Sequence, residues 1–169
     1  MKKIAIIGSP GSGKSTLAKL LEQKTSLPTY HLDSLFWSKN WEKPSKEKWI
    51  KLQKDLIKLP AWIIDGNYNS TLELRTSAAD TIIFLDYPTY LCTYRVLKRM
   101  LINYRKSSPD LGDNSERINL KILIFVLLFK RRNRDRILNL LDKESTKKVF
   151  ILKNKNDLKE FIAEVNKVG

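Results

Sequence analysis

The sequence predicts a single α/β domain in which a five-stranded parallel sheet lies between two layers of helices. Short apolar runs alternate along the chain with segments whose apolar residues recur every three or four positions. Strands that alternate with helices in this way build parallel sheets. The 169 residues contain no repeat or low-complexity linker, and 42% of them are hydrophobic, which suits one hydrophobic core.

The first part of the chain alternates strand and helix twice. Residues 4–7 form a β-branched run, which is typical of a central strand buried on both faces. Residues 14–24 place apolar residues at helical spacing with lysines between them. Residues 28–32 can form a second strand, after which Pro44 precedes a helix start and Pro60 ends that helix.

Two apolar runs in the middle of the chain each end in an aspartate. Residues 62–65 end in Asp65, and residues 81–86 end in Asp86. We expect both runs to be buried parallel strands with functional residues at their carboxyl ends.

The last part of the chain contains three predicted helices and a final strand. A long helix is expected after Pro88, and the Asp- and Asn-rich segment 107–114 is expected to be irregular. A further helix is predicted at about 116–141. Residues 148–152 form the fifth strand, and 156–167 form an amphipathic helix.

The chain is strongly basic. Lysine and arginine number 32 against 18 aspartate and glutamate residues, a formal charge of +14. This excess favours a polyanionic partner, either a nucleotide or a nucleic acid, although a surface that is basic for solubility is the alternative.

No feature of the sequence indicates export or a membrane. The longest apolar stretch, 122–129, has eight residues, whereas a membrane-spanning helix needs about 20. A signal peptide is not evident, and Cys92 is the single cysteine, so no internal disulfide can form. We expect a cytoplasmic protein without a membrane partner, and the oligomeric state stays open.

The segment from Gly8 to Ser15 reads Gly-Ser-Pro-Gly-Ser-Gly-Lys-Ser and matches the pattern of a phosphate-binding P-loop. It directly follows the first predicted strand and opens the first predicted helix, where the mechanism needs it. Glycines let the backbone approach the phosphates, and the N–H groups of the loop and helix point at the anion. The motif predicts binding of a nucleoside triphosphate, most simply ATP with magnesium.

Each part of the loop has an expected role. Lys14 brings a full positive charge to the β- and γ-phosphates, and the Ser15 hydroxyl is a suitable magnesium ligand. The residues expected to bind the nucleotide are Gly8, Pro10, Gly11, Ser12, Gly13, Lys14, Ser15 and Thr16.

These motifs resemble those of the adenylate-kinase-like P-loop phosphotransferases. Asp65-Gly66 is similar to the Asp-Gly step at the end of the third strand in nucleoside monophosphate kinases, and this likeness implies that Asp65 holds magnesium through water. Asp86-Tyr87-Pro88 resembles an Asp-x-Pro segment whose helix carries two arginines onto ATP. The resemblance assigns these roles to Arg95 and Arg99, which lie one helical turn apart.

A narrower resemblance is to the bacterial DNA topology modulation proteins, an adenylate-kinase-like subgroup. It is carried by residues 30–37, 62–68 and 105–117. The name implies an influence on DNA supercoiling. After Gly66 the chain reads Asn67-Tyr68 where adenylate kinases have Phe-Pro-Arg, so the acceptor stays open between a nucleotide, a nucleoside and a small hydroxyl compound.

Asp33 and Arg75 are candidates for the acceptor side, whereas His31 is not. Asp33 follows the second predicted strand, where related small-molecule kinases place an acidic residue at the acceptor hydroxyl; capping of the next segment is the alternative. His31 is expected to be a structural strand residue rather than a general base. Arg75 lies in the helix after Asp65-Gly66 and is a candidate for binding the phosphate of a nucleotide acceptor.

The basic residues at about 105–136 predict a lid. Arg132 and Arg136 are four residues apart and share a helical face, so with Arg105 they could close over the transferring phosphoryl group. Which of Arg105, Arg131, Arg132, Arg134 and Arg136 reaches the phosphates stays open. The competing interpretation is that 130–136 contacts the DNA backbone without sequence preference.

The predicted activity is ATP- and magnesium-dependent phosphoryl transfer to a small acceptor, with Lys14, Asp33, Arg99 and Arg132 as catalytic residues. The alternative is a DNA-associated ATP-binding protein with slow or no kinase activity.

Overall fold

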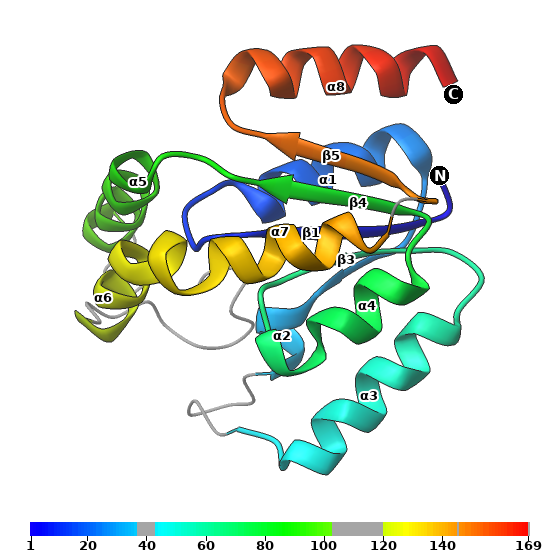
Figure 1. The fold of residues 1–169 in the computed structure, drawn as a ribbon, viewed down its shortest axis with the longest axis horizontal. Coiled ribbons are helices and arrows are strands. Elements are labelled where there is room, and N and C mark those ends of the chain that lie inside the picture. The colour runs from blue at the N-terminus through cyan, green and yellow to red at the C-terminus, as the bar shows by residue number, and fades with distance from the viewer. Residues whose placement is uncertain (37–42, 103–119, 145, 169) are drawn as a thin grey trace.

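The computed structural model of the chain describes residues 1–36, 43–102, 120–144 and 146–168. The strands are β1 (Lys3–Gly8), β2 (Thr29–His31), β3 (Trp62–Asp65), β4 (Thr81–Leu85) and β5 (Lys148–Leu152). They form one sheet in the order β2-β3-β1-β4-β5, and every neighbouring pair is parallel (Figure 1). The predicted five-stranded parallel sheet is confirmed.

The helices lie between and beyond these strands. They are α1 (Lys14–Thr25), α2 (Leu32–Phe36), α3 (Lys46–Lys58), α4 (Leu72–Ala78), α5 (Thr89–Ile102), α6 (Leu120–Phe129), α7 (Asp135–Asp142) and α8 (Lys155–Val168), with a 3-10 turn η2 (Asn69–Thr71) and a π-helical turn η4 (Lys130–Arg134). No helix in the described ranges combines the length and the apolar character needed to span a bilayer. The predicted irregular segment 107–114 and the predicted lid residue Arg105 lie outside the described residues.

Alternation along the central strand divides the core into two layers. Ile4 and Ile6 of β1 pack with apolar residues of α1, α5 and α8. Ala5 and Ile7 of the same strand face the other way and pack with residues of α3, α4 and α7. The sheet is therefore covered on both faces, which confirms the predicted three-layer arrangement.

Helix α2 was not predicted. It begins directly after β2 at Leu32, which is fully buried. Gly66, at the end of β3, accommodates this residue, because a Cβ on Gly66 would lie 2.7 Å from the Leu32 Cβ. A five-residue helix is too short to show helical periodicity in the sequence, so only tertiary packing reveals it.

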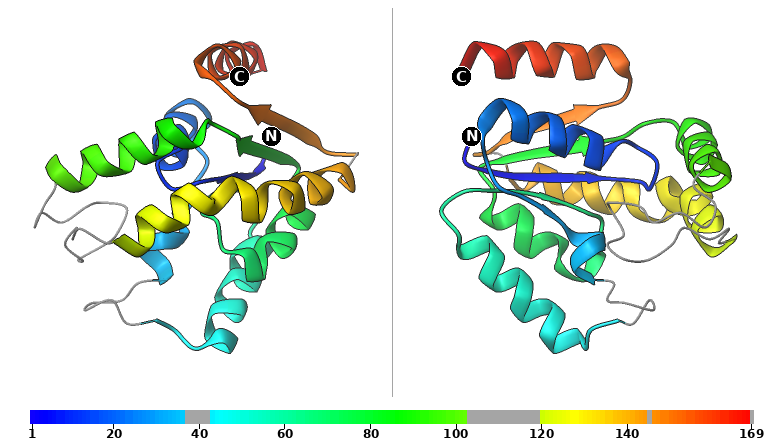
Figure 2. Two further views of the ribbon diagram at one scale, coloured as in Figure 1. Left: turned by 60° about the vertical axis from the view of Figure 1, so that its left-hand side comes forward. Right: turned by 180° about the vertical axis from the view of Figure 1, so that it is seen from behind.

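The predicted helix at about 116–141 is present over 120–142, but a π-helical turn at η4 interrupts it. On one side of this turn, Val126 of α6 joins the core layer that contains α5. On the other side, Ile137 and Leu141 of α7 join the opposite core layer beneath the sheet. Figure 1 and Figure 2 show the helix passing from under the sheet to the side of α5, beyond the carboxyl ends of the strands.

Candidate functional site

The P-loop lies between β1 and α1 and packs directly against α5. Gly11 and Gly13 have φ angles of 78° and 99°, in the left-handed region that favours glycine. A Cβ on Gly11 would lie 2.4 Å from the Cys92 carbonyl oxygen of α5. The loop is thus held in a compact form, and the Ser12 amide donates a hydrogen bond to the Ser9 carbonyl oxygen at 3.1 Å.

Lys14 occupies the centre of the site. Its ammonium group donates a hydrogen bond to the Ser9 carbonyl oxygen at 3.0 Å. Desolvation by burial lowers the pKa of Lys14, while the negative charges of Asp33 and Asp65 oppose this shift and the positive charge of Arg99 adds to it. Lys14 therefore lies within electrostatic range of three residues predicted to act in the site.

Asp65 lies at the end of β3, and only 3% of its surface is exposed. Its Oδ2 accepts a hydrogen bond from the Ser15 hydroxyl at 2.9 Å. Its Oδ1 is 2.8 Å from Nδ1 of His31. The structure thus brings Ser15 and Asp65, the two predicted magnesium residues, together. It also shows a contact between His31 and Asp65 that the sequence did not predict.

Ser15 and Asp65 fit a magnesium ion that arrives with a nucleotide. Within the described ranges no group of three or more His, Cys, Asp or Glu residues could hold a metal ion by itself. Mg²⁺ in phosphoryl-transfer sites takes one or two protein oxygens and completes its shell with substrate phosphates and water. Ser15 Oγ and the Asp65 carboxylate supply hard oxygen ligands of this kind.

Asp33 lies in the first turn of α2 and is exposed. The Tyr68 hydroxyl donates a hydrogen bond to its Oδ1 at 2.9 Å. Burial, and then the charge of Asp33, raise the pKa of Tyr68 well above its ordinary value, so the phenol remains a donor. Tyr68 also packs with Phe36 and Trp49, with ring centroids 4.7 and 4.8 Å away.

Arg95 and Arg99 are on α5, the helix against which the P-loop packs. Nη1 of Arg95 lies 3.4 and 3.3 Å from the carbonyl oxygens of Gly11 and Ser12. Its guanidinium group also lies over the Tyr87 ring, 5.2 Å from the centroid. The structure therefore places Arg95 in direct contact with the loop, and the positive charge of Arg99 contributes to the lowered pKa of Lys14.

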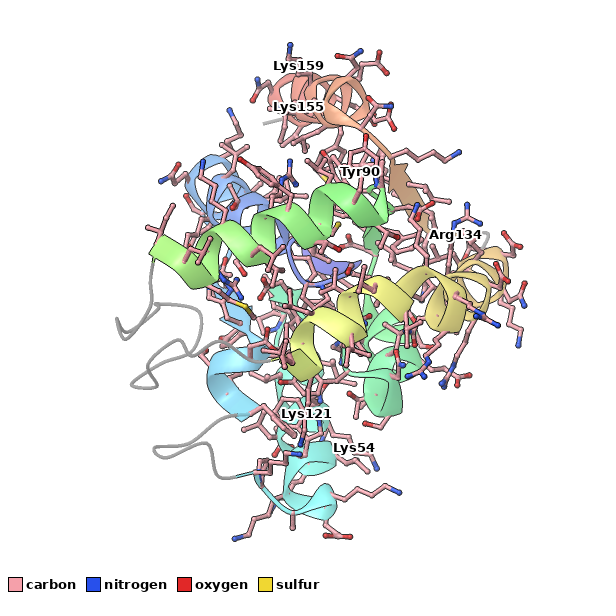
Figure 3. All side chains as sticks on the ribbon, turned by 90° about the vertical axis from the view of Figure 1, so that its left-hand side faces the viewer. Lys54, Tyr90, Lys121, Arg134, Lys155 and Lys159 are labelled. Carbon is pink, nitrogen blue, oxygen red and sulfur yellow. The ribbon has the colours of Figure 1, made fainter. Side chains whose placement is uncertain are left out.

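A pocket of about 400 Å³ lies where the P-loop and α1 meet α5 and α8. Aliphatic side chains, the Tyr87 ring and the cations of α5 and α8 surround it. Figure 3, which views the molecule from the carboxyl ends of the strands, shows Lys155 and Lys159 on α8 above α5. The lining residues are Ser12, Gly13, Thr16, Leu17, Leu20, Leu85, Tyr87, Arg95, Lys155, Leu158 and Lys159.

Arg75 has a structural position, so the prediction that it reaches an acceptor phosphate is wrong. Only 1% of its surface is exposed. Its Nη1 donates to Gln53 Oε1 at 2.7 Å and to Thr71 Oγ1 at 2.9 Å, and its Nη2 donates to the Gly66 carbonyl oxygen at 3.2 Å. Burial lowers the pKa of Arg75 to about 10. Helical spacing alone did not show that this face of α4 is turned inward.

Asp86 anchors the continuous helix from α6 through η4 to α7 (120–142), called the basic helix below, to the sheet. Its Oδ1 is 2.9 Å from Lys130 Nζ, and its Oδ2 is 2.9 Å from Arg134 Nε. Asp86 is buried, and both cations come from η4. Figure 3 shows Arg134 on this helix beside the end of the sheet. The predicted lid residue Arg132, between these two cations, has an exposed side chain.

The pairing of Lys130 and Arg134 with Asp86 follows from helical spacing. Lys130 and Arg134 are four residues apart, the same spacing as Arg132 and Arg136. Periodicity therefore showed two equivalent pairs, and nothing in the sequence showed which pair faces Asp86. Arg136 instead borders a shallow pocket next to Glu73 of α4.

Comparisons with known proteins support the fold. No protein-family model matches the sequence, and no curated protein matches it. Among solved structures, a shikimate kinase from Aquifex aeolicus vf5 is similar, with a TM-score of 0.53, 18% sequence identity and 99% of each chain covered. At this level of identity the likeness establishes the fold alone, an α/β sandwich around a parallel sheet.

Proposed function

We propose that this protein transfers a phosphoryl group from ATP to a small acceptor, with magnesium as the cofactor. The observation that carries the proposal is the contact between the P-loop and the end of β3, where the Ser15 hydroxyl donates a hydrogen bond to the buried carboxylate of Asp65 at 2.9 Å. Next to Ser15, the negative charges of Asp33 and Asp65 oppose the lowering of the pKa of Lys14 by burial. A loop with the conformation that cradles phosphates thus contacts the candidate magnesium residue.

The donor side is assigned to the P-loop and α5. Lys14 and the loop amides would hold the β- and γ-phosphates, and magnesium held near Ser15 and Asp65 would neutralise charge on them. The purine would enter the pocket beside Tyr87 and Arg95, since a ring and a guanidinium provide stacking surfaces next to the loop. Arg99 would clamp phosphate oxygens from the α5 side.

The acceptor side is assigned to Asp33. The acceptor oxygen attacks the γ-phosphorus while the bond from that phosphorus to the ADP oxygen breaks, and the acceptor proton leaves to Asp33 or to water. Tyr68 fixes the Asp33 carboxylate by donating to Oδ1. Because phosphoryl transfer depends mainly on positioning and charge, Asp33 need not be a strong base.

The test is the release of ADP from ATP and Mg²⁺ across nucleoside monophosphates, nucleosides and small hydroxyl compounds. One acceptor should stimulate turnover strongly, and Lys14→Ala should lower that turnover by about 100-fold or more. Lys54→Ala, which removes an exposed lysine of α3, is the matched control and should leave turnover unchanged. A panel without any stimulation, or a Lys14→Ala variant as active as the wild type, would contradict the proposal.

A second candidate function is non-specific DNA association by an ATP-binding protein of the DNA topology modulation type. Its support is the charge of +14 together with the exposed side chains of Arg131, Arg132 and Arg136. These three arginines remain available to phosphates outside the protein, whereas Lys130 and Arg134 are paired with Asp86.

A further inference from the structure

The sheet places His31 and Asp65 side by side. Strands β2 and β3 are parallel neighbours, and His31 is the register partner of Asp65 at their carboxyl ends. Asp65 is held in turn by β1, since it is the register partner of Ile6 and the next amide, that of Gly66, donates to the Ile6 carbonyl oxygen at 3.3 Å. The contact between the two side chains is thus fixed by three strands.

The Asp65 carboxylate uses its two oxygens for two different partners. Oδ2 accepts from the Ser15 hydroxyl at 2.9 Å, and Oδ1 contacts His31 Nδ1 at 2.8 Å. An ionised carboxylate can only accept, so this contact requires the proton of the imidazole to be on Nδ1. The side chains of His31 and Asp65 are only 19% and 4% exposed, so little water competes for the bond.

We infer that His31 is a positioning residue that holds the Asp65 carboxylate with Oδ2 turned toward Ser15 and the magnesium ion. This inference rests on the proposed function, because the metal is expected to arrive with ATP. His31 itself need not touch the metal or the nucleotide. Its effect passes through Oδ1: with that oxygen bonded, the carboxylate cannot rotate away from Ser15. Partners of this kind typically contribute a factor of 10 to 100 in metal affinity or activity.

The same contact assigns His31 to the metal side of the site. Nδ1 is engaged by Asp65, and the acceptor candidate Asp33 takes its own hydrogen bond from Tyr68. His31 and Asp33 are two residues apart in the sequence but serve opposite halves of the site. Loss of His31 should therefore change the response to the metal more than the affinity for the acceptor.

Two conservative variants separate positioning from general packing. In asparagine the amide nitrogen is bonded to Cγ, as Nδ1 is in histidine, so His31→Asn can still donate to Asp65. In glutamine the nitrogen lies one bond further out, so His31→Gln offers a similar amide in the wrong place. His31→Ala removes the donor altogether. Circular dichroism and thermal unfolding would check that each variant folds.

Two readouts are needed, and one of them does not depend on turnover. The first is the affinity for a non-hydrolysable ATP analogue, measured by calorimetry with Mg²⁺ and again with EDTA. The second is the Mg²⁺ concentration that gives half-maximal ADP release with the best acceptor. We expect His31→Ala and His31→Gln to reduce the gain in analogue affinity that Mg²⁺ provides by 10- to 100-fold, and to raise the half-maximal Mg²⁺ concentration by a similar factor. His31→Asn should keep both values close to those of the wild type. The affinity measured in EDTA should be the same in all three variants and the wild type.

A double variant tests whether the effect passes through Asp65. His31→Ala should add little to Asp65→Ala, because the histidine has no carboxylate left to position. The inference is overturned if His31→Ala and His31→Gln show the same Mg²⁺ dependence as the wild type, or if the Asn and Gln variants are equally impaired. It is also overturned if Mg²⁺ does not change the affinity of the wild type for the analogue. Failure of the proposed function would look different, because the wild type would then not bind the analogue, or Lys14→Ala would bind it equally well.

Discussion

Two buried charged groups with different surroundings, Asp65 of β3 and Arg75 of α4, meet the carboxyl end of β3. Asp65 faces the P-loop and accepts hydrogen bonds from Ser15 and His31, all of which belong to the candidate site. Arg75 lies behind the same strand end and binds the Gly66 carbonyl oxygen together with Gln53 and Thr71. Asp65 is therefore placed to act in the candidate site, whereas Arg75 stabilises the backbone next to Asp65.

Replacing Arg75 should reduce stability and leave catalysis intact. Arg75→Ala leaves Gln53 Oε1, Thr71 Oγ1 and the Gly66 carbonyl oxygen without their donor in a buried space. Unpaired buried polar groups cost about 1–3 kcal/mol each, so we expect a loss of about 3 kcal/mol or more in the free energy of unfolding. Urea denaturation measures this loss.

The control for Arg75 is Arg136→Ala, which removes an exposed arginine and should change the free energy of unfolding by less than about 0.5 kcal/mol. At temperatures where Arg75→Ala is fully folded, its KM for the acceptor should equal that of the wild type. A large rise in this KM without a loss of stability would return Arg75 to the acceptor site.

At the scale of elements, the helix from α6 to α7 joins two layers of the molecule. Val126 packs on the α5 side and Ile137 packs beneath the sheet, with the π-helical turn between them. Within that turn Asn133 is buried, and its side chain donates to the Phe129 carbonyl oxygen at 3.2 Å and accepts from Asn69 at 2.6 Å. The turn is thus tied to the loop after β3 as well as to Asp86 after β4.

Neutralising Asp86 should loosen this helix. Asp86→Asn keeps the shape of the side chain but removes the charge that Lys130 and Arg134 share. The two cations are about one-third exposed, at 34% and 35%, so water screens part of the loss and we expect a cost of about 1–2 kcal/mol. Hydrogen exchange should accelerate over 120–142 more than in the strands.

The matched control for Asp86 is Asp135→Asn. Asp135 lies 3.9 Å from Arg134 Nη1, but its side chain is 87% exposed, so this pair should contribute less than about 1 kcal/mol. Equal exchange over 120–142 in Asp86→Asn and in the wild type would show that the ion pairs do not hold the helix.

The elements that the sequence predicted are those that local patterns determine. Four of the five strands are largely apolar runs, the P-loop is a contiguous motif, and α3 has a Ser45 cap that accepts from the Lys48 amide. The contact between His31 and Asp65 could not be predicted, because it depends on the pairing of two strands that are 34 residues apart. The inward face of α4 and the π-helical turn likewise depend on tertiary packing.

At the scale of the whole molecule, the charge of +14 is the property that the proposed kinase activity leaves least explained. A nucleotide site uses a few cations, and Lys14, Arg95 and Arg99 already supply them. Many other lysines and arginines are exposed, among them those of α3 and of the basic helix. The question is whether this charge forms a local DNA contact or only a solvated surface.

A charge-reversal experiment decides between these two explanations. If the basic helix binds DNA and its arginines do not form the predicted catalytic lid, changing Arg131, Arg132 and Arg136 to glutamate should abolish binding to duplex DNA while acceptor phosphorylation persists. Reversing Lys48, Lys51 and Lys54 of α3 instead changes the net charge equally and is the matched control.

Binding should fall steeply with salt, with a slope of log K against log salt near −0.9 for each phosphate contacted. A smaller slope in the arginine variant alone would locate the contact at the basic helix. Equal losses in both variants would show that affinity follows total charge, and the basic surface would then have no specific role in DNA binding.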